Sequence, residues 1–303
     1  MSIKVELLRK EFGNQVAVND ISFEVSSGNI VGFLGPNGAG KSTTMKMLTT
    51  YLLPTSGKAW ICGIDVIKKP MEVKKHIGYL PESNPLYYDM YVKEYLEFVA
   101  DIHQLGTNKK QRIDEMIVMT GLQKEIKKKI GKLSKGYKQR VGLAQAMIHN
   151  PDVLILDEPT SGLDPNQIVD IRDLILKIGQ EKTVLLSTHI MQEVEAMCNK
   201  LIIIKNGNIV ANDNIENVNS NTDNQYELIN VTFSQTFDLK RLENLKNTIS
   251  TTLVDTHTIQ FQTTNSSELR KEILNWSLSN NIDIENLQIN KSSLEDKFRE
   301  LTQ

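Results

Sequence analysis

The segment GPNGAGKS, residues 35–42, has the glycine spacing and the final Lys-Ser pair of a phosphate-binding loop. Its glycines let the backbone curl so that successive N–H groups converge on phosphate oxygens. Lys41 would reach the terminal phosphates, and Ser42 would offer its hydroxyl to Mg²⁺. The loop follows the apolar run Asn29–Leu34 and precedes an expected helix over Lys41–Leu52, whose positive dipole end favours anions. We therefore predict a nucleotide site made of Gly35, Pro36, Asn37, Gly38, Ala39, Gly40, Lys41, Ser42 and Thr43.

A second segment, VLILDEP, places two carboxylates directly after an aliphatic run. Val153–Leu156 is apolar throughout and too short for a helix, which indicates a strand buried on both faces. Asp157 follows this strand and is placed to hold Mg²⁺ through water. Glu158 is placed to take a proton from the attacking water. The two segments together predict hydrolysis of a bound nucleotide.

The elements that position these residues can be read from the apolar pattern. Strands are expected over residues 3–12 and 18–25, and helices over Tyr91–Leu105 and around Ile113–Thr120. After Val153–Leu156 we expect a helix near 168–178, a strand at Thr183–Ser187, a short helix, and a strand at Leu201–Lys205 that a hairpin at Asn206-Gly207 follows. This alternation favours an α/β fold with a mostly parallel sheet. In such a sheet His189 would lie beside the strand of Glu158, where it could hydrogen-bond the γ-phosphate or orient the water.

The charge balance limits the classes of partner. The 303-residue chain has 35 basic and 37 acidic side chains, a formal net charge of −2, so a chain-wide basic field for nucleic acid is absent. The segment Lys124–Arg140 holds eight basic residues and one acid, but Tyr137 alone is available for base stacking. We therefore expect no nucleic-acid binding.

The remaining composition is that of a globular chain with a core, 40% hydrophobic and 24% charged. The longest aliphatic runs, Val153–Leu156 and Leu201–Ile204, are too short to cross a bilayer, and the first residues do not form a signal peptide. A role at a membrane would need another chain to span it. Cys62 and Cys198 have no metal-ligand spacing and are expected to be reduced cytosolic thiols.

Several motifs in order make residues 1–215 resemble the ATP-binding subunit of ABC transporters. Leu133–Arg140, LSKGYKQR, resembles the family signature LSGGQ, and Ser161–Asp164, SGLD, resembles its D-loop. His189 stands at the family's switch histidine, and Phe12 stands where an aromatic ring stacks on adenine. The resemblance implies a P-loop ATPase domain with an antiparallel β subdomain and a helical subdomain at about residues 90–150.

The resemblance also implies a second subunit. In the family, the signature binds the γ-phosphate held by the opposite subunit, so Ser134, Gly136 and Asp164 would complete a nucleotide site in trans. Two copies of the chain, or one copy and a relative, would enclose two ATP molecules. Ser134 would donate its hydroxyl, and Gly136 would let a backbone N–H approach from a helix N-terminus.

The chain departs from the family pattern at the signature and at the loop IGYLPES. Lys135 and Tyr137 replace the usual Gly and Gln, which leaves Ser134 and Gly136 as the expected contacts. Glu82 stands where the family more often has the Gln that reaches Mg²⁺. A glutamate could still coordinate the metal through oxygen, so Ser42, Asp157 and Glu82 form the expected metal set.

Residues beyond 215 change in composition. The asparagine-rich residues 216–224 are interpreted as a linker, and residues 225–303 as a small α+β domain. Its expected order is strand 226–233, helix 238–247, strands 249–254 and 257–262, helix 266–279 and strand 282–289, which fits a ferredoxin-like βαββαβ fold. Ser292 and Glu295 form a capping box for a last helix. An irregular extension packed on the first domain is the alternative.

By this resemblance the chain is expected to be a cytoplasmic ATPase, using ATP and Mg²⁺, that is attached to the inner face of the cell membrane through permease subunits. The Glu82 loop and the ending SSLEDKFRELTQ resemble the ABC-2-type export ATPases, and within them the gliding-motility subunit of Bacteroidetes. The alternatives are a drug or polysaccharide exporter of the same type, or a soluble ABC ATPase that acts on the ribosome or DNA.

Overall fold

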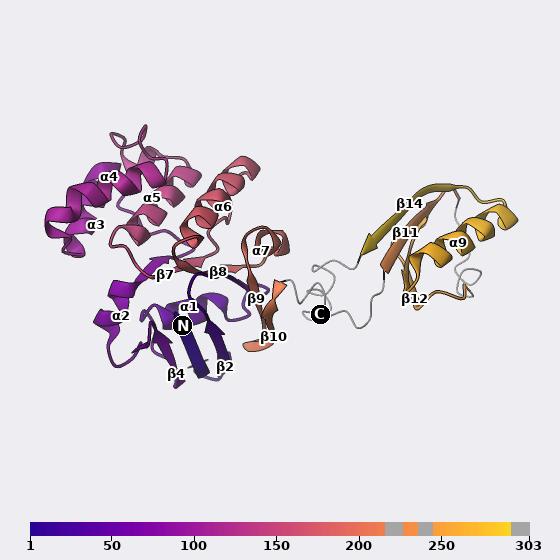
Figure 1. Ribbon diagram of the computed structural model, residues 1–303, viewed down its shortest axis with the longest axis horizontal. Coiled ribbons are helices and arrows are strands. Elements are labelled where there is room, and N and C mark those ends of the chain that lie inside the picture. The colour runs from indigo at the N-terminus through magenta and orange to yellow at the C-terminus, as the bar shows by residue number, and fades with distance from the viewer. Residues whose placement is uncertain (216–226, 236–244, 292–303) are drawn as a thin grey trace. The chain divides into compact units, whose positions relative to one another are not determined.

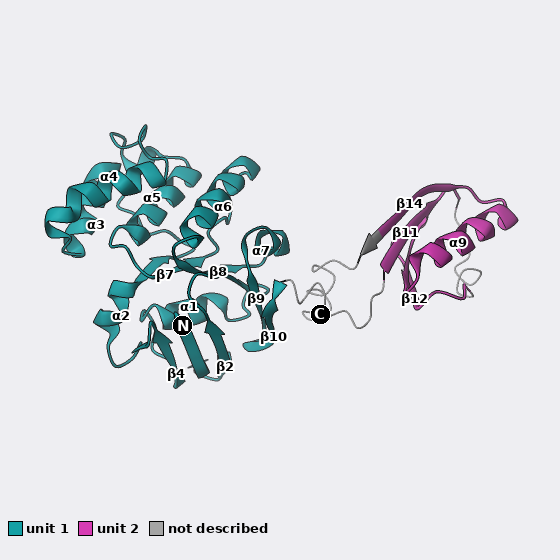
Figure 2. Cartoon of the chain, in the orientation of Figure 1, with its two compact units in different colours: residues 1–215, 302 teal, residues 216–301, 303 magenta. Residues whose placement is uncertain are grey.

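The computed structural model describes residues 1–215, 227–235 and 245–291 (Figure 1). The chain divides into two compact units, residues 1–215 and residues 216–301 (Figure 2). The expected linker at 216–224 and the helix after Ser292 lie outside the described residues. Of the helix expected at 238–247, residues 245–247 are described, and they belong to a loop with a turn.

The centre of the first unit is a six-stranded sheet in the order β10-β9-β3-β8-β7-β6. Every neighbouring pair is parallel except β9 and β10, which form the expected hairpin around Asn206-Gly207. All residues of β3, β7 and β8 are buried because both faces of the sheet are covered. The strands are β3 (Ile30–Leu34), β6 (Ile77–Leu80), β7 (Val153–Asp157), β8 (Thr183–Thr188), β9 (Lys200–Lys205) and β10 (Asn208–Asn214). The predicted α/β class with a mostly parallel sheet is confirmed.

A second sheet of the first unit is antiparallel, in the order β2-β1-β4-β5. Its strands are β1 (Ile3–Phe12), β2 (Gln15–Val25), β4 (Ser56–Ile61) and β5 (Ile64–Asp65). Helix α1 (Lys41–Leu48) packs against strands of both sheets, and its Met45 and Leu48 share a buried cluster with Ile3 and Phe33. The first helical turn is thereby fixed next to the end of the β1–β2 hairpin.

Three helices, α3 (Val92–Ile102), α4 (Lys109–Met119) and α5 (Lys135–Met147), gather at one side of the sheet (Figure 1). Apolar positions of all three, including Leu96, Met116 and Leu143, belong to one buried cluster with Leu154 of β7. These helices form the expected helical group within residues 90–150. Helices α2 (Pro70–His76), α6 (Pro165–Gly179) and α7 (Met191–Met197) complete the unit.

The second unit contains a four-stranded antiparallel sheet in the order β12-β13-β11-β14 and helix α9 (Ser266–Asn280). The strands are β11 (Glu227–Phe233), β12 (Ser250–Leu253), β13 (Thr258–Thr263) and β14 (Ile284–Lys291). Alternate residues of β11 and β13 are buried, among them Val231 and Phe261, and they share a core with Leu269 and Ile273 of α9. In chain order the described strands pair as 4-1-3-2, the order of a ferredoxin-like sheet.

Candidate nucleotide site

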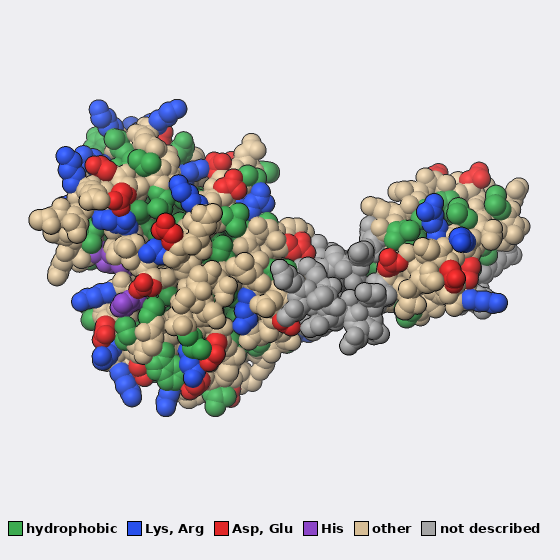
Figure 3. All heavy atoms as spheres, viewed as in Figure 1, with side chains coloured by type: hydrophobic (Ala, Val, Ile, Leu, Met, Phe, Trp, Pro, Cys, Tyr) green, Lys and Arg blue, Asp and Glu red, His purple; other side chains and the backbone are tan. Residues whose placement is uncertain are grey.

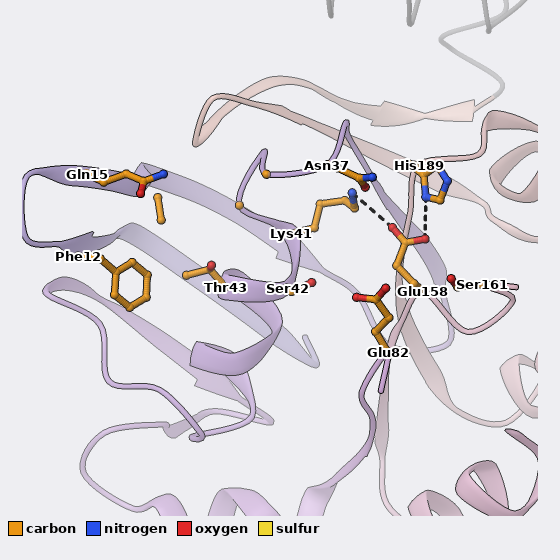
Figure 4. Close-up of a pocket in the computed structure, with 13 residues that line it drawn as sticks. Phe12, Gln15, Asn37, Lys41, Ser42, Thr43, Glu82, Glu158, Ser161 and His189 are labelled. Atoms are coloured by element: carbon orange, nitrogen blue, oxygen red, sulfur yellow. Dashed lines mark hydrogen bonds and ion pairs between the residues drawn. The ribbon is translucent and has the colours of Figure 1, made fainter. Parts of the chain in front are cut away.

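A polar cleft of about 570 Å³ opens above the carboxyl ends of the parallel strands (Figure 4). Its walls come from segments far apart in sequence: the β1–β2 hairpin, the glycine loop with the start of α1, and the residues after β6, β7 and β8. Ten of the predicted residues line it: Phe12, Asn37, Gly38, Gly40, Lys41, Ser42, Thr43, Glu82, Glu158 and His189. The fold thus brings both sequence motifs to one place.

The glycine loop has a conformation that other residues adopt rarely. Gly38 and Gly40 have φ values of 80° and 109°, and a Cβ at Gly40 would lie 2.5 Å from the carbonyl oxygen of Ala17. Lys41 is only 6% exposed, and its ammonium donates to the carbonyl oxygens of Gly35 at 2.7 Å and Pro36 at 3.2 Å. The lysine is therefore fixed by the loop it follows, with its charge at the floor of the cleft.

Asp157 links three segments through one oxygen. Its Oδ1 accepts a hydrogen bond from Ser42 Oγ at 3.0 Å and another from Ser187 Oγ at 2.5 Å. The parallel register that pairs Asp157 with Ser187 sets the second contact. Asp157 is 2% exposed, so its carboxylate is buried where it accepts the hydrogen bond from the Ser42 hydroxyl. These hard oxygen donors fit Mg²⁺, which prefers oxygen ligands.

Glu158 has a cation on one side and a histidine on the other (Figure 4). Its Oε1 lies 3.4 Å from Lys41 Nζ, and its Oε2 lies 2.8 Å from His189 Nδ1. The residue is 7% exposed and has a φ of 49°, in the left-handed region that glycine favours. Its backbone N–H lies within hydrogen-bond distance of both the carbonyl and the hydroxyl oxygen of Ser187. The side chain is thus aimed into the cleft by a tightly held backbone.

The predicted signature residues lie elsewhere in the same unit. Ser134 caps helix α5 and accepts from the N–H of Tyr137, and Asp164 caps α6 and accepts from the N–H of Gln167 at 2.9 Å. Ser134 and Gly136 line a separate small hollow with Arg140 and Asp170. One chain therefore does not bring these residues to its own cleft.

Lys135, which departs from the family signature, contacts the SGLD loop. Its ammonium lies against Gly162, which has a φ of 65°, and a Cβ at that position would lie 2.2 Å from the lysine Nζ. The signature and the SGLD loop are thus in contact within the chain through this lysine. Sequence reasoning anticipated neither this contact nor the cleft residues Gln15 and Ala17, whose types carry no phosphate-binding signal; Ser161 was recognised only as part of the SGLD loop.

A phosphate loop on a parallel sheet, with buried carboxylates at the carboxyl end of another strand of that sheet, β7, defines a P-loop nucleotide hydrolase. A model of the ABC transporter family matches residues 18–161. The bacitracin transport ATP-binding protein BcrA of Bacillus licheniformis is 42% identical over 210 residues, 69% of this chain and 68% of its own. The chain belongs to the family of ABC transporter ATP-binding proteins, and it is an ATPase.

Two further comparisons extend this result. The uncharacterized ABC transporter ATP-binding protein YcbN of Bacillus subtilis (strain 168) is 34% identical over 296 residues, 97% of this chain and 94% of its own. A bacterial ABC transporter cassette, solved as a dimer, superposes with a TM-score of 0.64 at 25% identity, covering 70% of this chain and 98% of its own. Among the described residues, no helix is long and apolar enough to span a membrane.

Proposed function

We propose that this chain powers an ABC exporter by hydrolysing ATP between two ATP-binding subunits. The observation that carries the proposal is the separation of the two predicted half-sites. Residues of the glycine loop, Glu158 and His189 line one cleft, and Asp157 is hydrogen-bonded to Ser42 beside it. Ser134 and Gly136 line another hollow. A second subunit that presents its own signature to this cleft would supply what the single chain leaves apart.

Each cleft residue has a role that its geometry supports. The loop N–H groups and Lys41 bind the phosphates, and the exposed ring of Phe12 stacks on adenine. Glu158 takes a proton from the attacking water, and His189, 2.8 Å from it, orients the carboxylate and the water. Ser42 and Asp157 would hold Mg²⁺, with Glu82 at the cleft wall. The metal would neutralise phosphate charge in the transition state.

The trans contacts complete the proposal for the dimer. Ser134 and Gly136 at the start of α5 offer a hydroxyl and a helix N-terminus to the γ-phosphate of the other subunit. Asp164 at the start of α6 belongs to the same contact region. A homodimer satisfies both sites with identical parts, which is the commonest arrangement of soluble oligomers.

A role in transport is supported by the name of the relative BcrA, a bacitracin transport ATP-binding protein. The outward direction rests on the resemblance to the ABC-2-type export ATPases. The permease subunits would be separate chains that hold this ATPase at the cytoplasmic face of the membrane. The gliding-motility association rests on the resemblance of the Glu82 loop and the C-terminal end, and it stays a prediction. On the face shown in Figure 3, basic and acidic side chains are interspersed over the first unit, which gives no support to a nucleic-acid partner.

The experiment is isolation of the affinity-tagged full chain from detergent-solubilised membranes of its source cells, with mass spectrometry of what accompanies it. We expect integral membrane proteins in stoichiometric amounts, and their genes beside this one. An unrelated tagged soluble protein is the control. Recovery of ribosomal proteins or DNA in place of membrane proteins would overturn the export proposal.

A further inference from the structure

A cysteine, a histidine and an aspartate meet outside the nucleotide site. One donor atom each from Cys62, His76 and Asp152 lies within 4.8 Å of the other two. His76 Nδ1 and Asp152 Oδ2 are 2.6 Å apart. Cys62 is a free thiol that is partly buried, and Asp152 is exposed, so the group can be reached from solvent. Sequence spacing gave no sign of this group because its members are 14 and 76 residues apart, values that match no metal-ligand motif.

The fold itself places these side chains together. His76 ends α2 directly before β6, and Asp152 directly precedes β7; the parallel register pairs Ile77 with Val153. The two residues are therefore neighbours at the amino ends of adjacent strands. Cys62 arrives from the turn between β4 and β5, where its φ is 49° and its N–H donates to the carbonyl oxygen of Ser2. Helix α2 contacts both β5 and β6, and it thereby joins the β4–β5 turn to strand β6.

We propose that Cys62, His76 and Asp152 form a Zn²⁺ site. Thiolate sulfur, imidazole nitrogen and carboxylate oxygen are the three ligand types that zinc takes in proteins, at about 2.3, 2.0–2.1 and 2.0–2.2 Å. A thiolate, a neutral imidazole and a carboxylate balance the two charges of the ion. Zinc would take the place of the proton between His76 and Asp152, and binding would release the thiol proton.

The geometry fits after a small adjustment. Ligands of a tetrahedral ion stand about 3.3–3.7 Å apart, as the bond lengths require. The His76–Asp152 pair would open from 2.6 Å, and the Cys62 sulfur would move inward from its place within 4.8 Å. Exposed Asp152 leaves room for water as the fourth ligand. The position at the negative end of helix α2 also favours a cation.

This site is distinct from the nucleotide cleft. Glu158, directly after the carboxyl end of β7, lines the cleft, whereas Asp152 precedes the amino end of the same strand. The ion would connect the β4–β5 turn of the antiparallel sheet to two strands of the central sheet. We therefore assign it a stabilising role that holds these two layers together, without a part in hydrolysis.

The test uses Co²⁺ as a spectroscopic probe on the full chain, freed of metal by a chelator and kept without nucleotide. We expect one equivalent to produce the near-ultraviolet band of a cobalt–thiolate bond and the visible bands of tetrahedral cobalt. Cys62→Ser abolishes the thiolate band, while the matched control Cys198→Ala retains it. The oxygen ligands of the nucleotide cleft contain no sulfur and cannot produce this band.

A second variant separates binding from folding. His76→Gln keeps Cys62 and should weaken cobalt affinity about tenfold or more while the circular dichroism spectrum is unchanged. Zn²⁺ should raise the unfolding temperature of the wild type and leave that of Cys62→Ser unmoved. Absence of the thiolate band in the wild type, or its persistence in Cys62→Ser, would overturn the proposal.

Discussion

Glu158 combines a functional position with an unfavourable backbone. Its oxygens contact Lys41 at 3.4 Å and His189 at 2.8 Å, and its φ of 49°, directly after β7, lies in the left-handed region. Such left-handed residues persist where surrounding bonds hold them, and the Ser187 oxygens do so here. The single residue therefore depends on the register between two strands.

The first prediction tests the base. Glu158→Gln keeps the shape of the side chain but removes its ability to take a proton, so the hydrolysis rate should fall by about 10²–10⁴. ATP binding should be retained, because Lys41 and the loop are unchanged. Turnover and equilibrium binding of a fluorescent nucleotide measure the two properties. The exposed Glu181→Gln is the matched control, and wild-type turnover in Glu158→Gln would refute the assignment.

For single residues, the sequence predicted those functional groups whose role depends on residue type. The loop, Asp157, Glu158 and His189 were identified because phosphate and proton chemistry require those groups at those spacings. Ser187 and Gln15 were missed because strand register and loop path place them, and neither has a local signal. Ser161 was recognised as part of the SGLD loop but not as a residue of this cleft. Cys62 was assigned as an ordinary thiol for the same reason, since its neighbours come from distant segments.

Among the elements, the buried strands of the central sheet and the amphipathic helices were mostly predictable, whereas the segment from β4 to β6 was not. Helix α2 has seven residues and buries only Val73, so it shows no apolar period. The helix expected over Lys41–Leu52 ends at Leu48, and Thr50 has a left-handed φ of 62°. The predicted helix from Tyr91 ends at Ile102 and is followed by a 3₁₀ turn. Helix ends depend on such backbone details more than on side-chain pattern.

A stacked histidine pair joins α3 to the end of α5 and makes a pH prediction. His103, after α3, and His149, after α5, have ring centroids 3.9 Å apart. Burial, then the charges of His103 and Arg112, lower the pKa of His149 to about 4, against its bond to the Ile77 carbonyl, which raises it. Burial also lowers the pKa of His103.

The sign follows from the lowered values. His149 takes up its proton near pH 6.5 in the unfolded chain but only near pH 4 in the folded chain. The free energy of unfolding therefore has its full value above pH 6.5 and decreases as the pH falls from 6.5 to 4. Allowing for partial exposure of the ring, we expect a loss of about 2 kcal/mol. Denaturant unfolding at pH 7 and 4.5 measures it. His149→Gln should reduce the difference in unfolding free energy between pH 7 and 4.5, while exposed His257→Gln should not. An equal difference in His149→Gln and the wild type would contradict this assignment.

For the whole molecule, the central question is whether one chain completes its own site. Ser134 lines a different hollow from the one that Glu158 lines, so the proposed contact of Ser134 with the γ-phosphate requires a second copy. Two protein concentrations should therefore give different hydrolysis rates per chain wherever the dimer is weak. A hydrolysis rate per chain that depends on protein concentration would indicate that Ser134 acts in trans, whereas a purely structural helix cap would give no such dependence.

The matching variant is Ser134→Asp. Aspartate caps a helix as well as serine does, so the fold should keep its stability, but the carboxylate would repel the γ-phosphate of the partner. We expect hydrolysis to fall about tenfold or more while ATP binding to the dilute monomer is unchanged. Asn265→Asp, at the cap of α9, is the control. Normal hydrolysis in Ser134→Asp would exclude the trans contact.

The left-handed backbone at Glu158 also has an evolutionary consequence. Glycine is the residue that this conformation accepts with least strain, and Glu and Gly codons differ by one base. A single mutation can therefore yield a well-folded subunit that lacks the proposed base. Such a chain could still form the proposed dimer with a functional copy. Selection against it must therefore act on the hydrolysis activity of the dimer and not on the folding of either copy.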